Sequence, residues 1–362
     1  MALSIQYLGD LVEFIYEYGL FLLKVVTFVI AIAIVVGLIV SAGARQKPSN
    51  VGVIQVTKIN DRFDDMRHAM KHAMFDGDVI KKAEKTLAKE KKQQMKVNKK
   101  KLKLKEALEE PKRVFLVDFD GDMKASAVAQ LREIVSAVLF VATPKDEVVL
   151  RLESGGGMVH SYGLAASQLD RIRQREIPLT VCVDKVAASG GYMMACVANK
   201  ICAAPFAVIG SIGVLAQLPN FHKILKKNDI DFEMLTAGEY KRTLTMFGEN
   251  TDKGREKFVE DLELTHGLFK DYVHQQRPII DIDAVATGEI WFGTKAKENS
   301  LIDELTTSDD YITGLASAFD VFEVTYTSKK SLPERLGLSV QMGIEKGISR
   351  IIGQFQTSRF FH

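Results

Sequence analysis

Residues 147–157 read EVVLRLESGGG, an apolar run that ends in three consecutive glycines. The run is short and rich in Val and Leu, which predicts a buried strand, and the glycines leave backbone N–H groups approachable at its end. A related pattern follows, since the strand expected over 179–183 leads through ASGG at 188–191 into an apolar helix over 192–198. Strands that alternate with helices in this way predict an α/β core.

The alternation extends on both sides of these two segments. Further strands are expected over 114–119 and 200–204, and helices over 128–138, 162–175 and 255–274. In the helices the apolar residues recur every three to four positions, which is the spacing of one buried helix face.

Composition excludes several classes of protein. The chain has 362 residues, of which 47% are apolar and 26% charged, so it is neither wholly disordered nor fibrous. Three cysteines (Cys182, Cys196 and Cys202) cannot build a disulfide scaffold, and their spacing fits no zinc site. Their apolar neighbours predict that they are small buried side chains. No metal site is expected.

One segment is long enough to cross a bilayer. Residues 25–44 carry no charge and lie between Lys24 and Arg45. A helix of this length matches a hydrocarbon core of roughly 30 Å. We expect an N-terminal segment, 1–48, that holds an uncleaved transmembrane helix. A cleaved signal peptide is the alternative, but the preceding stretch is long and acidic rather than short and basic.

Residues 49–110 are expected to form a juxtamembrane region with a lysine-rich spacer. Between 81 and 105 there are 12 lysines and two acids, so this block carries a charge of +10 within a chain of net charge +2. A solvated spacer, helical or disordered, is favoured, and attachment to anionic membrane lipid is the alternative. Nucleic-acid binding is not expected, because no aromatic residue interleaves the lysines.

The glycine-rich strand ends are the candidate site. They match neither the P-loop nor the dinucleotide-binding pattern. An oxyanion hole fits better, because Ser189 lies between a strand and a helix, where its Oγ would be exposed beside the helix N-terminus. The N–H of Gly190, with that of Gly156 or Gly157, could then hold an oxyanion. A serine at this point could equally be a simple helix N-cap.

Two residues are candidates for the general base. His160 follows the three glycines and lies close to the expected site. Lys241 lies beside Tyr240 and shortly before an apolar stretch at 244–247, and apolar surroundings favour a neutral lysine. Either residue could also be an ordinary surface side chain.

Five segments, in this order, resemble the motifs of the signal peptide peptidase A family (peptidase family S49), and most closely its SohB branch. They are the glycine loop, the nucleophile segment, a GSIG loop, the base segment and a closing motif, at 153–159, 184–192, 210–214, 237–242 and 287–305. One departure is Gly155, which stands where the family loop usually has proline. Glycine does not restrict φ as proline does, so the loop is expected to be more flexible before substrate binds.

The resemblance implies a ClpP/crotonase-like spiral of β-β-α units for a protease domain over 111–325. It implies a Ser-Lys dyad in which neutral Lys241 takes the proton from Ser189, whose Oγ attacks a peptide carbonyl. Ser211 would orient the lysine amine, and Gly190 with Gly156 or Gly157 would hold the oxyanion. Substrates would be signal peptides or fragments of membrane and periplasmic proteins, with apolar side chains before the scissile bond. No cofactor is implied.

The cellular location and the oligomeric state of the protein are inferred from the resemblance and from the charge pattern. The family places its protease domain on the periplasmic side of the bacterial inner membrane, which we favour, whereas the positive charges after residue 44 would place it in the cytoplasm. The resemblance also implies a homo-oligomer. The amphipathic tail, 326–362, is a candidate contact in it, or else packs on its own domain or on lipid.

Two other functions compete with a serine endopeptidase. One is a catalytically inactive scaffold or chaperone-type membrane protein with a protease-like fold. The other is an acyl-CoA enzyme of the crotonase type, which also uses an oxyanion hole. The pairing of Ser189 with Lys241 argues against the second.

Overall fold

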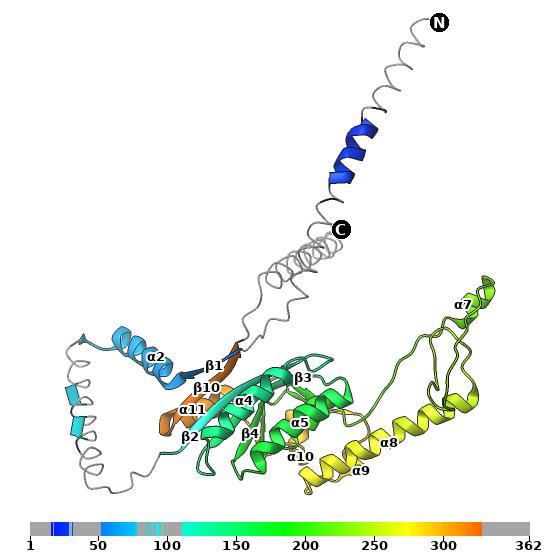
Figure 1. The fold of residues 1–362 in the computed structure, drawn as a ribbon. Coiled ribbons are helices and arrows are strands. Elements are labelled where there is room, and N and C mark those ends of the chain that lie inside the picture. The colour runs from blue at the N-terminus through cyan, green and yellow to red at the C-terminus, as the bar shows by residue number, and fades with distance from the viewer. Residues whose placement is uncertain are drawn as a thin grey trace, which may run out of the picture. The chain divides into compact units, whose positions relative to one another are not determined.

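The computed structural model (Figure 1) describes residues 16, 18–28, 31, 52–77, 85, 86, 89, 92, 93, 96 and 111–327. The chain divides into two units, one of residues 54–326 and one of residues 1–53 with 327–362. Residues 18–28 are helical, and no helix within the described residues has the length and apolar character needed to cross a membrane. Much of the expected span at 25–44, most of the lysine-rich block and the tail from 328 onward lie outside the described residues.

A ten-stranded sheet forms the centre of the folded unit. Its main path runs through β1 (Val53–Lys58), β10 (Asp320–Thr327), β2 (Arg113–Gly121), β3 (Glu147–Ser154), β4 (Leu179–Val183), β6 (Lys200–Ala203) and β9 (Glu304–Leu305). Three short strands lie off this path, namely β5 (Val186–Ala188), β7 (Val208–Gly210) and β8 (Ile290–Phe292). The α/β core expected from the sequence is confirmed.

The sheet forks at the end of β3, and this fork creates the site. β3 pairs in parallel with β4 over residues 148–151, but at Ser154 its partner is Ala187 of β5. β5 in turn pairs in parallel with β7, which pairs antiparallel with β8. The glycine loop after β3 and the turn after β5 therefore leave the sheet at neighbouring points.

Helices cover both faces of the sheet. The helices of the folded unit are α2 (Ile59–Met74), α4 (Val128–Val141), α5 (Val159–Arg173), α6 (Gly190–Ala195), α7 (His222–Lys227), α8 (Asp252–Gln276), α9 (Ile282–Val285), α10 (Gly293–Glu298) and α11 (Ser308–Ala318). Phe115 and Val117 of β2 belong to the larger apolar core with α4 and α5, whereas Val114 and Leu116 belong to a smaller one with α2 and α11. Burial on both faces explains the unbroken apolar run of this strand.

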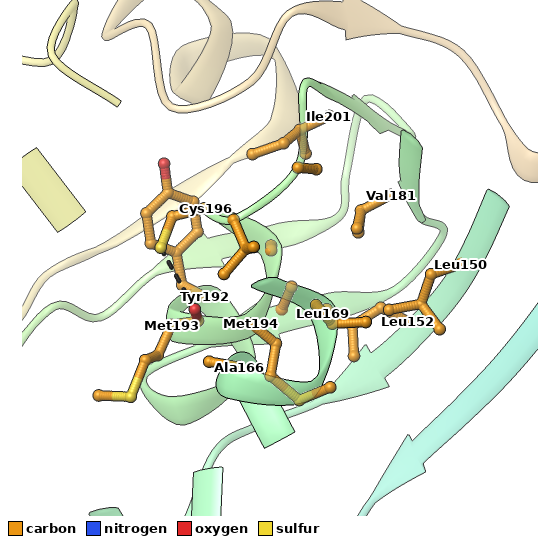
Figure 2. Close-up of a cluster of buried hydrophobic side chains, with 14 of the residues drawn as sticks. Leu150, Leu152, Ala166, Leu169, Val181, Tyr192, Met193, Met194, Cys196 and Ile201 are labelled. Atoms are coloured by element: carbon orange, nitrogen blue, oxygen red, sulfur yellow. Dashed lines mark hydrogen bonds between the residues drawn. The ribbon is translucent and has the colours of Figure 1, made fainter. Parts of the chain in front are cut away.

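Helix α6 lies at the centre of the larger core (Figure 2). All six of its residues are buried, and Tyr192, Met193 and Met194 pack with side chains from β3, α5, β4 and β6. Cys196 follows directly, and its thiol donates to the carbonyl of Met193 at 3.2 Å. Cys182, Cys196 and Cys202 are all free and buried, as their apolar neighbours predicted.

A long arm, residues 211–251, separates β7 from α8. It contains only the short helix α7 and leads away from the sheet, to which α8 returns (Figure 1). Many of its apolar side chains are exposed, among them Leu215, Ile224, Ile230, Phe232 and Leu235. Exposed apolar side chains gathered on one segment are typical of a surface that contacts another protein or a membrane.

Candidate active site

Ser189 occupies the turn between β5 and α6 in a strained conformation. Its φ is 53° and its ψ −119°, a region that non-glycine residues seldom adopt. The turn is held by a hydrogen bond of 2.8 Å from the Ser189 N–H to the carbonyl of Gly210, at the end of β7. The serine side chain makes no capping hydrogen bond. Ser189 thus stands at the N-cap position of α6, but its hydroxyl does not serve as a cap.

A cavity of about 530 Å³ lies in front of this serine. Its polar lining combines Ser189 and Gly190 with the glycine loop at 155–157 and with Ser211. The rest of the wall is largely apolar, from Met123, Val159, Met193, Val214, Leu215 and Phe269. Four of the five sequence-predicted segments thus meet at one cavity, because Thr287 and Gly288 of the closing motif also line it.

The glycines of this cavity differ in the use of their N–H groups. Gly156 donates its N–H to Ser154 Oγ at 3.0 Å. The N–H groups of Gly157 and Gly190 form no hydrogen bond among the residues described. Gly157 fits closely, since an added Cβ would lie 2.1 Å from the carbonyl oxygen of Met123. Two glycines that line the cavity, one from each glycine-rich segment, therefore have an N–H group that is not used in a hydrogen bond among the described residues.

The loop after β7 forms the opposite rim. Ser211 has a φ of 50°, and its N–H donates to the carbonyl of Glu289 at 2.7 Å. On α8, His266 Nε2 lies 3.2 Å from the carbonyl oxygen of Ile212. His266 lines the cavity and is the only histidine among the described residues that line it. Sequence reasoning missed it, because α8 looks like an ordinary polar helix.

The two candidate bases lie outside this cavity. His160 is exposed on the first turn of α5. Lys241 is exposed on the arm, where its backbone N–H donates to the carbonyl of Gly238 at 3.1 Å. Neither residue lines the cavity in front of Ser189. The described chain therefore brings together the nucleophile candidate, the N–H donors and Ser211, but not the base.

Comparison with known proteins supplies the family. The model of the peptidase family S49 N-terminal region matches residues 13–169, and the peptidase family S49 model matches residues 171–321. A protein of Haemophilus influenzae named "Probable protease SohB" is 48% identical over 344 residues, which is 94% of this chain and 96% of that protein. This chain belongs to peptidase family S49.

Other proteins similar to this chain are also named as proteases. A "Probable protease SohB" of Buchnera aphidicola subsp. Schlechtendalia chinensis is 49% identical over 305 residues, which is 83% of this chain and 99% of that protein. "Protease 4" of Haemophilus influenzae is 26% identical over 160 residues, only 44% of this chain. The resemblance to the S49 family and its SohB branch is thereby confirmed.

Proposed function

We propose that this S49 protein is a membrane-anchored serine endopeptidase that uses a Ser-Lys dyad, with Ser189 as nucleophile and Lys241 as general base. The observation that carries the proposal is the strained turn at Ser189, whose uncapped hydroxyl faces a cavity with two unused N–H donors. Strain of this kind persists where the surrounding structure enforces it, typically at catalytic turns. Family membership supports peptide hydrolysis.

In the proposed reaction, Ser189 Oγ attacks the peptide carbonyl while neutral Lys241 accepts its proton. The C–O bond forms as the carbonyl π bond breaks, and the resulting oxyanion is held by the N–H groups of Gly157 and Gly190. The protonated amine of Lys241 then donates to the leaving nitrogen, and water releases the acyl group by the reverse sequence. Ser211, on the cavity rim, is proposed to orient the Lys241 amine.

The proposed oxyanion hole uses Gly157 rather than Gly156, because Gly156 already donates to Ser154. We expect Gly157→Ala to lower kcat by about 100-fold or more, as loss of an oxyanion donor does. Its Cβ would meet the Met123 backbone at 2.1 Å, so the loop must shift. Gly163→Ala is the matched control, since a Cβ there meets nothing within 4 Å. Equal kcat in both variants, measured on one peptide, would contradict the assignment.

We propose that Lys241 reaches the site through assembly, with the arm of one copy completing the cavity of the next. Lys241 is exposed on this arm, which also carries exposed apolar side chains suited to a contact with a neighbour. The homo-oligomer would keep the site enclosed and away from folded proteins.

Mixing two inactive variants tests both the dyad and its assembly. Purified Ser189→Ala and Lys241→Ala proteins should each lack peptide hydrolysis. Dissociated and reassembled together in equal amounts, they should recover about a quarter of wild-type activity, because random assembly pairs an intact serine with an intact lysine at about one contact in four. A mixture that stays inactive, although mixed oligomers are seen by light scattering, would contradict a shared site.

We also propose a class of substrate and a cellular location. The apolar cavity wall favours peptides with apolar side chains before the scissile bond. Signal peptides and fragments of membrane or periplasmic proteins fit that chemistry. From the family resemblance we further propose anchoring in the bacterial inner membrane, with the protease domain in the periplasm. The forked sheet, with the order β4, β5, α6, β6 and β7, is proposed to be the ClpP/crotonase-like spiral. The alternative to a peptidase is a catalytically inactive scaffold, and the activity measurements on the variants above would distinguish the two.

A further inference from the structure

Tyr162, on the first turn of α5, is fully buried beneath the candidate site. Its hydroxyl lies 2.8 Å from the carbonyl oxygen of Asp122, which can only accept, so the phenol donates there. Ser154 Oγ lies 2.5 Å from the same hydroxyl and accepts the N–H of Gly156 at 3.0 Å. A carbonyl oxygen, that of Gly121 at 3.2 Å, is the more distant acceptor for Ser154.

These contacts form a directed chain of hydrogen bonds. It runs from the Gly156 N–H through the hydroxyls of Ser154 and Tyr162 to the carbonyl of Asp122. Each hydroxyl accepts one hydrogen bond and donates the next, an arrangement in which neighbouring bonds strengthen one another. Burial raises the pKa of Tyr162, so its hydroxyl keeps the proton that the chain needs. The glycine loop is thereby tied to the ends of β2 and β3.

The ring of Tyr162 supports the other side of the site. An added Cβ on Gly190 would lie 2.4 Å from Cγ of Tyr162, so the backbone of Gly190 rests directly against the ring. Gly190 carries one of the two unused N–H donors, and Gly157, next to the hydrogen-bonded Gly156, carries the other. One side chain therefore contacts both segments that frame the cavity.

Close backbone packing also holds the glycine loop, because a Cβ on Gly156 would lie 2.6 Å from the Gly190 nitrogen and one on Gly157 would lie 2.1 Å from the Met123 carbonyl oxygen. A Cβ on Gly155 would meet nothing within 4 Å, so no side chain packs there. On the far side of the tip, the N–H of Met158 donates to the carbonyl of Met123 at 2.9 Å. Beside this packing, two hydrogen-bonded connections hold the loop, and the chain through Tyr162 is the one that reaches into the core.

We propose that Tyr162 is a positioning residue for peptide hydrolysis, which sets the spacing of the Gly157 and Gly190 N–H groups by holding both of their backbone segments. The inference rests on the proposed serine-peptidase function. It assigns Tyr162 a role in the transition state only, because the oxyanion forms after substrate has bound. Loss of its hydroxyl should therefore affect kcat and leave KM nearly unchanged.

Tyr162→Phe tests this role, because it removes the hydroxyl and keeps the ring. Tyr192→Phe is the matched control: Tyr192 is equally buried, and its hydroxyl donates to the carbonyl of Leu301 at 2.9 Å, away from the glycine loop. With full-length protein and one apolar peptide, we expect kcat to fall about 10- to 100-fold in Tyr162→Phe, with KM within about twofold of wild type. Tyr192→Phe should keep kcat within about twofold, whatever its effect on Tm.

Ser154→Ala breaks the same chain one link earlier and keeps the test usable if Tyr162→Phe folds poorly. The double variant should be no slower than the slower single variant, because both changes interrupt one chain. Three results would overturn the role of Tyr162. The first is a wild-type kcat in both Tyr162→Phe and Ser154→Ala, and the second is an equal loss of kcat in Tyr162→Phe and Tyr192→Phe. The third is a loss of kcat in the double variant that equals the product of the two single losses. If the wild-type protein does not hydrolyse peptides, or if Ser189→Ala does not lower its activity, the proposed function itself fails.

Discussion

Replacing Ser189 by alanine is expected to lower kcat for peptide hydrolysis by about 10⁶-fold, the loss seen when a catalytic nucleophile is removed from a serine protease. In the proposed reaction the Ser189 Oγ forms the covalent intermediate, so its removal leaves no nucleophile. Folding should be unaffected, because the Ser189 side chain makes no capping hydrogen bond and alanine retains the backbone conformation. Initial rates on an apolar peptide, with Tm measured in parallel, check both expectations.

The matched control for this variant is Ser167→Ala. Ser167 is exposed on α5, and its hydroxyl donates to the carbonyl of Gly163 within the same helix. It should hydrolyse the peptide at the wild-type rate. A Ser189→Ala protein that retains turnover within tenfold of wild type would rule out Ser189 as nucleophile.

Lys241→Ala and Lys241→Arg are both expected to lower kcat by about 10⁴-fold, near the upper end of what a general base contributes. Arginine preserves the positive charge but cannot deprotonate near neutral pH, so charge alone should not rescue activity. Lys226→Ala, at another exposed lysine of the arm, should behave as wild type. The measurement is kcat for the three variants at one pH and as a profile from pH 5 to about 10.

The shape of the profile identifies the base. With a lysine as base, wild-type activity should rise toward alkaline pH, because only the neutral amine accepts a proton. A rise near pH 6 to 6.5 would instead indicate a histidine. His266 would then be the residue to replace, because it lines the cavity and His160 does not. Normal turnover by Lys241→Ala would refute the dyad directly.

Much of the fold was predictable because its central elements are long and buried. The strand expected at 179–183 has the same first and last residues as β4. The strands expected at 114–119 and 147–152 lie within β2 and β3. The short strands β5, β7 and β8 were not predicted. Each has only three residues, too few for a periodic pattern, and tertiary pairing decides their conformation.

The candidate site was predictable only where its residues lie in glycine-rich strand ends. Ser189, Gly157 and Ser211 follow β5, β3 and β7, and parallel pairing of these strands brings them to one cavity. The contributions of Tyr162 and His266 could not be predicted, since both lie on helices whose sequence shows only burial or polarity. Lys241 is exposed, as the alternative of an ordinary surface lysine has it. The sequence could not decide between this and a buried base, because the conformation of a long arm depends on its contacts rather than its local sequence.

Covalent labelling of Ser189 tests the central claim most directly. Full-length protein in membranes is treated with a fluorophosphonate, which phosphonylates an activated serine, and the modified residue is mapped by peptide mass spectrometry. We predict modification at Ser189 in the wild type and in Ser167→Ala, and none in Ser189→Ala. Modification that is absent in the wild type, or that maps to a different serine and persists in Ser189→Ala, would contradict the account.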